Sequence, residues 1–115
     1  MNFAILNISN VTVLQGAFDQ TFAPLLASLP KIDFAFVDGN HRKIPTLQYF
    51  ELLLAHANNN TIMVFDDIHW SVEMETAWTT IQHHPAVTLT IDLFFIGIVF
   101  INRDIKVKQQ FTIAY

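Results

Sequence analysis

The sequence predicts an α/β domain in which parallel strands alternate with helices and a C-terminal antiparallel hairpin completes the sheet. Residues 32–37 and 61–65 are short apolar runs typical of buried strands, and both run directly into acidic residues. One helical pattern separates them, so they form a βαβ unit with parallel strands. After Pro85 the pattern changes to strands alone, at residues 87–93 and 96–102, and the short connection between them predicts a hairpin.

The first third of the chain contains one clear strand and one clear helix. Residues 11–15 form a β-branched run that stops at Gly16, which indicates a strand entering a turn. Residues 21–29 have helical apolar spacing, with Pro24 in the first turn and Pro30 as terminator. Residues 1–10 show no strand pattern, and we expect Phe3 and Leu6 to end a helix.

Two further helices follow the acidic strands. The first has Pro45 in its first turn, an apolar face from Leu47 to Ala57, and a stop at residues 58–60. The second is capped by Ser71 and ends before Pro85. Its expected buried stripe is Met74, Ala77, Trp78 and Ile81. A last strand is predicted at residues 111–115.

Composition limits the classes of function. The chain has 115 residues, of which 52% are hydrophobic and 14% charged, so one globular domain is expected. A net charge of −4 with six Lys plus Arg argues against nucleic-acid binding. The chain has no cysteine, and its longest apolar stretch, residues 93–101, is too short to cross a membrane. Since no signal peptide pattern precedes it, we expect a cytoplasmic protein without membrane partners.

The acids at the two strand ends are the strongest functional signal. Asp38 follows the first strand, and Asp66 and Asp67 follow the second. Ligands bind at the carboxyl edge of an open parallel sheet, and neighbouring strands lie about 4.8 Å apart, so the acids can share a cation or a polar ligand. Helix capping or solvation of the strand ends is the alternative interpretation.

Two histidines and a tryptophan lie beside these acids. His41 and His69 are candidate catalytic bases and substrate-side groups, although each can instead hydrogen-bond a neighbouring carboxylate. Trp70 is a candidate substrate contact, and a hydrophobic staple before the Ser71 cap explains it equally well.

The order of these motifs resembles the C-terminal half of a class I S-adenosylmethionine-dependent methyltransferase, closest to small bacterial proteins of the O-methyltransferase-like group. The motifs are the turn at Gly16, Val-Asp-Gly-Asn-His at 37–41, Phe-Asp-Asp-Ile-His-Trp at 65–70 and the terminal hairpin. The resemblance extends from residue 2 to about 103. It implies a Rossmann-like sheet lacking its first two strands, with residues 11–15 as the third strand. Residues 1–115 would then be a single partial domain that begins within the helix before that strand.

The resemblance also implies site residues. Gly16, Ala17 and Phe18 match the turn that borders the adenine of S-adenosylmethionine, and Asp38 matches the position facing the methyl donor. Together with Asp66 and Asp67, Asp38 resembles the metal triad of catechol-type O-methyltransferases, where the pair is Asp-Asn. Carboxylate oxygens suit Mg²⁺ or another divalent cation, which would orient a substrate hydroxyl, whereas the nearby histidines favour a transition metal.

The expected reaction is methyl transfer from S-adenosylmethionine to an oxygen or nitrogen of a small molecule. The chain alone is expected to be inactive, because it has no glycine-rich cofactor loop and no ribose-binding acid. The alternative is a non-catalytic module that forms homo-oligomers through exposed sheet edges at residues 11–15 and 32–37. Residues 39–41, Gly-Asn-His, also occur in metal-dependent phosphoesterases, but the partner motifs of that class are missing from the sequence.

Overall fold

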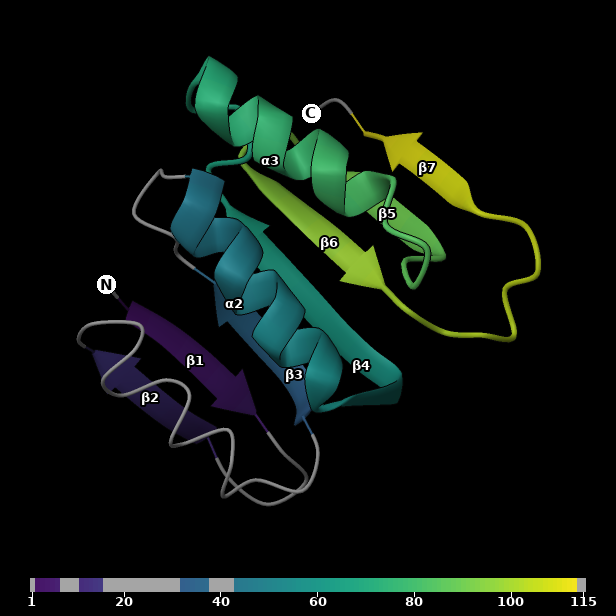
Figure 1. Ribbon diagram of the computed structural model, residues 1–115, viewed down its shortest axis with the longest axis horizontal. Coiled ribbons are helices and arrows are strands. Elements are labelled where there is room, and N and C mark those ends of the chain that lie inside the picture. Colours follow the sequence, from purple (N-terminus) through teal and green to yellow (C-terminus); the bar gives the residue numbers. More distant parts are fainter. Residues whose placement is uncertain (1, 7–10, 16–31, 38–42, 114–115) are drawn as a thin grey trace.

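The computed structural model describes residues 2–6, 11–15, 32–37 and 43–113, which form a seven-stranded mixed sheet with helices on one face (Figure 1). The strand order is β2-β1-β3-β4-β6-β5-β7. The elements are β1 (Asn2–Leu6), β2 (Val11–Gln15), β3 (Ile32–Val37), α2 (Lys43–Ala55), β4 (Ala57–Asp66), α3 (Val72–Gln82), β5 (Leu89–Asp92), β6 (Ile96–Phe100) and β7 (Gln109–Thr112). Among these helices, none is both long and apolar enough to span a membrane.

The predicted βαβ unit is confirmed. β3 and β4 are parallel neighbours, and Val37 lies opposite Phe65 in their register. The connecting helix α2 has Pro45 in its first turn, where the missing amide hydrogen interrupts no helical hydrogen bond. The predicted helix at residues 21–29 lies outside the described residues.

The hydrophobic core fills the space between the sheet and the two helices. All four predicted inward positions of α3 are buried, and Ser71 caps this helix by accepting a hydrogen bond from the Met74 amide at 3.1 Å. From α2 and the sheet the core includes Ala35, Val37, Tyr49, Phe50, Leu53, Met63, Phe65 and Val99. The two helices also meet directly, where the Thr46 hydroxyl lies 3.7 Å from the Met74 sulfur.

The C-terminal hairpin is also confirmed. β5 and β6 pair antiparallel, and the Leu93 amide donates to the Ile96 carbonyl at 2.9 Å at the turn. β6 also pairs antiparallel with β4 and therefore lies between β4 and β5. The last strand begins earlier than expected, at Gln109, and runs parallel to β5 at the sheet edge.

The prediction for the first ten residues is wrong. Asn2–Leu6 is a strand, β1, rather than the end of a helix. The spacing of Phe3 and Leu6 fits either structure over so short a run, and periodicity cannot separate the two. β1 pairs antiparallel with β2 on one side and with β3 on the other. β3 is therefore not an open edge as expected, whereas β2 lies at the end of the described sheet.

The residues expected to stop the first helix belong to β4 instead. Asn58, Asn59 and Asn60 lie in the strand, which starts one residue after His56. The Asn58 amide donates to the Thr61 hydroxyl at 2.8 Å, and the Asn60 amide donates to Asn58 Oδ1 at 2.7 Å. These side-chain hydrogen bonds satisfy backbone groups at an irregular strand start, which asparagine achieves in turns as well.

The sheet face opposite the helices carries two cross-strand rows of apolar residues. One row joins Phe34, Ile62, Phe100 and Leu89, and the other joins Phe36, Val64, Ile98, Ile91 and Phe111. Most of these side chains retain partial exposure, and Phe111 is 50% exposed. The described helices thus bury only one side of this sheet.

A tight contact between Gly97 and Trp78 generates a stability prediction. A Cβ at Gly97 would lie 2.4 Å from Cη2 of Trp78, whose ring is 3% exposed. Because the buried ring cannot move without disturbing the core, we expect Gly97→Ala to lower the free energy of unfolding by about 1–3 kcal/mol. Urea denaturation measures this loss.

The matched control places the same substitution in a Trp78→Leu background. There the clash is removed, so adding Gly97→Ala should cost less than it does beside tryptophan. Equal losses in the two backgrounds would show that the ring contact is not the cause.

Candidate active site at the carboxyl edge

The carboxyl edge of the sheet is where β3 and β4 both end. Their register puts Val37 beside Phe65, so the chain leaves both strands at the same edge. Asp66 is the last residue of β4, and Asp67 starts the following turn. Asp38 and His41, together with the predicted cofactor turn Gly16, Ala17 and Phe18, lie outside the described residues. The structure therefore brings Asp66, Asp67, His69 and Trp70 to this edge.

The turn after β4 is held in a defined conformation. Asp67 has a φ of 56°, in the left-handed region, which aspartate tolerates better than most residues. Its amide donates to the Phe95 carbonyl at 2.7 Å and to Asp66 Oδ1 at 3.1 Å. The Trp70 amide in turn donates to the Asp67 carbonyl at 3.0 Å. These bonds tie the Asp66–Asp67 pair to the β5–β6 turn.

His69 is clamped between two carboxylates. Its Nδ1 lies 2.8 Å from Glu75 Oε2, and its Nε2 lies 2.6 Å from Asp92 Oδ2. We call these three residues the His69 clamp. It joins the turn after β4 to the first turn of α3 and the end of β5. Asp92 is 7% exposed, and its other oxygen accepts from the Phe94 amide at 2.8 Å.

The clamp favours the protonated form of the imidazole. Burial lowers the pKa of His69, but the hydrogen bonds and charges of Glu75 and Asp92 raise this pKa by a larger amount, so the net shift is upward. Both ring nitrogens then donate, one to each carboxylate. In this arrangement His69 holds structure together and has no free nitrogen to act as a base. The hydrogen-bonded alternative for His69 thus agrees with the geometry.

Exposed aromatic side chains line the same edge. Trp70, Phe94 and Phe95 are 64%, 60% and 59% exposed. Phe94 stacks on the His69 ring with centroids 5.4 Å apart, and Phe95 meets Phe94 edge-on at 5.2 Å. The hydrophobic-staple interpretation of Trp70 is wrong, because the side chain is exposed and the staple position on α3 is Glu75.

Sequence reasoning missed Glu75 as a partner of His69 and missed Asp92, Phe94 and Phe95 altogether. Asp92 ends a third strand in acid, the same signal that singled out the first two strands. The sequence indicates Phe94 and Phe95 only as the connection of the hairpin. Adjacent aromatic side chains in a tight turn are nevertheless a signal, because they cannot be buried in the core. Within the described residues, no three carboxylate, imidazole or thiol groups are arranged to hold a metal ion.

Comparison with known proteins gives one family match. A family model described as a methyltransferase domain matches residues 5–68, more than half of the 115-residue chain. The match lies in the first part of this chain and ends in the turn after β4, so the hairpin expected to share the resemblance lies beyond it.

A similar protein is the uncharacterized protein R132 of Acanthamoeba polyphaga mimivirus, 34% identical over 74 residues. The match covers 60% of this chain and 34% of that protein, so this chain corresponds to about a third of its relative. No solved structure matches the chain significantly.

The His69 clamp predicts a pH-dependent stability. Because folding raises the pKa of His69, the clamp contributes fully below the ordinary imidazole value of 6.5 and loses its contribution as pH rises through the folded-state value. We expect His69→Gln to lower the free energy of unfolding by about 1–3 kcal/mol at about pH 6, above the ordinary pKa range of carboxyl groups, and by less at about pH 8.5. Urea denaturation at the two pH values measures this.

His83→Gln is the matched control. His83 is exposed, and its ring nitrogen Nδ1 hydrogen-bonds the Thr79 carbonyl of its own helix, with no carboxylate partner among the described residues. Its effect should not depend on pH in this way. A loss for His69→Gln that is constant between the two pH values would contradict the charged clamp.

Proposed function

Because the chain belongs to the methyltransferase domain family, we propose that its carboxyl edge forms one wall of a site for methyl transfer from S-adenosylmethionine to an oxygen or nitrogen of a small molecule. The observation that carries the proposal is the parallel register of β3 and β4, which ends two acid-terminated strands at one edge. In this proposal β3 and β4 are the fourth and fifth strands of the family's sheet.

The chemistry of the edge suits a cationic methyl donor. S-adenosylmethionine supplies a methyl group on a positively charged sulfur next to a planar base. Asp66 and Asp67 provide negative charge, and Glu75 and Asp92 leave one net negative charge after pairing with a protonated His69. Trp70 and Phe94 offer exposed aromatic surface on which a planar group can stack.

The acceptor has to be oriented and has to lose a proton. Its oxygen or nitrogen lone pair would form the new bond to the methyl carbon while the bond from sulfur to that carbon breaks. In this proposal Asp66 and Asp67 take the acceptor proton or hold the acceptor through a divalent cation, with Asp38 as a further ligand. Carboxylates supply the hard oxygen ligands that Mg²⁺ prefers, and such a cation lowers the pKa of an acceptor hydroxyl.

The isolated chain is proposed to bind without turnover. The family's cofactor loop is rich in glycine, whereas the three glycines here, Gly16, Gly39 and Gly97, are far apart in the sequence. A site built from this wall alone encloses less of the cofactor, which weakens binding and admits water.

A non-catalytic role in self-association is the second candidate. The observation that favours it is the pair of apolar rows on the sheet face opposite α2 and α3, which run from β3 across the sheet towards β7 at its edge. Sheets with one apolar face stack on a second sheet about 10 Å away, and two copies of this chain can do so about a two-fold axis.

Calorimetric titration of S-adenosylmethionine, with and without Mg²⁺, tests the methyl-transfer proposal. We expect weak binding that Asp66→Asn reduces about tenfold, because the substitution keeps the Oδ1 acceptor for the Asp67 amide and removes the charge. Asp67→Asn should be tolerated, since asparagine also adopts a positive φ and completes the family's Asp-Asn pair.

Asp104→Asn, at an exposed acid after β6, is the control for net charge. Absence of binding in both metal conditions would refute a cofactor site on this chain. Binding that is unchanged by a chelator would remove the divalent cation from the proposal.

Sedimentation velocity tests self-association. We expect a dimer of the 13.2 kDa chain, shifted towards monomer by Phe111→Lys, because Phe111 is exposed on β7 and lies in the second apolar row. Val107→Lys, at a residue that is 72% exposed outside the sheet, should leave the dimer intact. A monomeric wild-type chain would exclude this role.

A further inference from the structure

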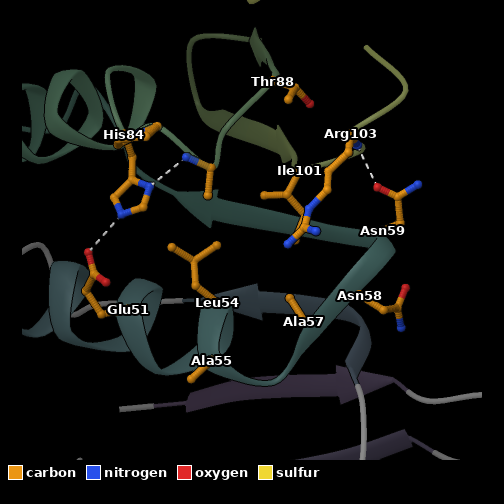
Figure 2. A pocket seen from close by; sticks show the side chains of 12 residues that line it. Glu51, Leu54, Ala55, Ala57, Asn58, Asn59, His84, Thr88, Ile101 and Arg103 are labelled. Atoms are coloured by element: carbon orange, nitrogen blue, oxygen red, sulfur yellow. Dashed lines mark hydrogen bonds and ion pairs between the residues drawn. The ribbon is translucent and has the colours of Figure 1, made fainter. Parts of the chain in front are cut away.

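A cavity lies at the edge of the sheet opposite the acids. It has a volume of about 850 Å³ and is lined by the end of α2, the start of β4, the connection from α3 to β5 and the chain after β6 (Figure 2). The proposed methyl-transfer site lies where β4 ends, so the two sites are separated by the length of that strand. Neither the sequence motifs nor the family match assigns a role to this cavity.

The floor of the cavity is apolar and fixed. Leu54, Ala57 and Ile101 line it, and each is partly buried against the hydrophobic core. They come from α2, β4 and the residue following β6, and Figure 2 shows them between the charged groups at the two ends. An apolar body of a ligand would therefore rest on a surface that the fold holds in place.

One end of the cavity presents a cation. The Arg103 amide donates to Asn59 Oδ1 at 2.6 Å, and Asn59 Nδ2 donates to Asn102 Oδ1 at 3.2 Å. These bonds fix the backbone from which the side chain extends beside Ile101 (Figure 2). Within the described part of the chain, the guanidinium has no hydrogen-bond or ion-pair partner, and a guanidinium matches a carboxylate with two parallel hydrogen bonds.

The other end presents an anion held by a histidine. His84 Nδ1 accepts from the Ala86 amide at 3.1 Å, so the neutral ring carries its proton on Nε2. Nε2 lies 3.4 Å from Glu51 Oε1, and the ring packs edge-on against Phe50. The Glu51 side chain is 63% exposed, which leaves its carboxylate accessible to a ligand.

We infer that this cavity binds a small zwitterionic amphiphile, with its carboxylate on Arg103, its ammonium on Glu51 and an apolar spacer over Leu54, Ala57 and Ile101. Because the cavity has opposite charges at the two ends of an apolar floor, it favours ligands that carry both a negative and a positive group, separated by an apolar spacer. Both charged side chains are exposed, so each contact contributes modestly and the complex is weak.

Nuclear magnetic resonance titration of the ¹⁵N-labelled chain with ε-aminocaproate tests the inference, with caproate and hexylamine as single-charge probes. We expect ε-aminocaproate to bind best and to shift the amides of Asn59, Ala86 and Thr88. Arg103→Gln should weaken the binding of ε-aminocaproate and of caproate about fivefold and leave the binding of hexylamine unchanged. Glu51→Gln should weaken the binding of ε-aminocaproate and of hexylamine and leave the binding of caproate unchanged.

Two further variants sharpen the result. Lys106→Gln removes a nearby exposed cation that does not line the cavity and should leave binding unchanged, whereas Arg103→Lys should restore part of it. Equal affinity for the three probes, shifts confined to the carboxyl edge, or unchanged binding in Arg103→Gln with a native spectrum would each overturn the inference.

Discussion

The parallel pairing of β3 with β4 is the constraint on which the rest of this structure depends. Parallel neighbours cannot be joined by a tight turn, so the chain must cross over through α2 and return to the starting edge. The crossover puts α2 on one face of the sheet, where Phe50 and Leu53 are buried against Met63 and Phe65. It also ends both strands at one edge and leaves the C-terminus of α2 at the other. The two candidate sites are thus consequences of one strand pairing.

The His69 clamp holds together three segments of the chain that meet at the carboxyl edge. The turn after β4, the start of α3 and the β5–β6 turn meet there, and each brings an acid or an aromatic ring close to the others. A protonated His69 neutralises one of the two carboxylates it contacts, and Phe94 covers its ring. The Asp67 amide bond to the Phe95 carbonyl fixes the same junction through the backbone. Residues that seem suited to catalysis by their position can therefore serve to hold the carboxyl edge in shape.

Much of the fold could be predicted because its signals are local. The Ser71 cap and the stripe from Met74 to Ile81 determine α3 almost alone, and a two-residue connection between apolar runs determines the hairpin. Residues 2–6 could not be assigned in the same way. A five-residue run with four apolar residues fits a helix or a strand, and only its pairing with both β2 and β3 decides between them. The Asn58–Asn60 run was misassigned because asparagine stops helices but also braces an irregular strand start.

The sites were predictable only where the chemistry follows a strand end in sequence. Asp66 and Asp67 satisfy that condition, and Asp92 at the end of β5 satisfies it too, although the sequence around Asp92 indicates only a hairpin. Contacts between segments that are far apart in the chain give no local signal in the sequence.

The pairing of His69 with Asp92 spans 23 positions, and the cavity between Glu51 and Arg103 joins α2 to the segment that follows β6. Such sites depend on the order of the strands in the sheet, and in this sheet β6 lies between β4 and β5. Because β6 runs antiparallel to β4, its end brings Ile101 and Arg103 beside the start of β4, where Ala57 and Asn59 lie. A parallel β6 would have carried those residues to the carboxyl edge, and the cavity between Glu51 and Arg103 would not exist.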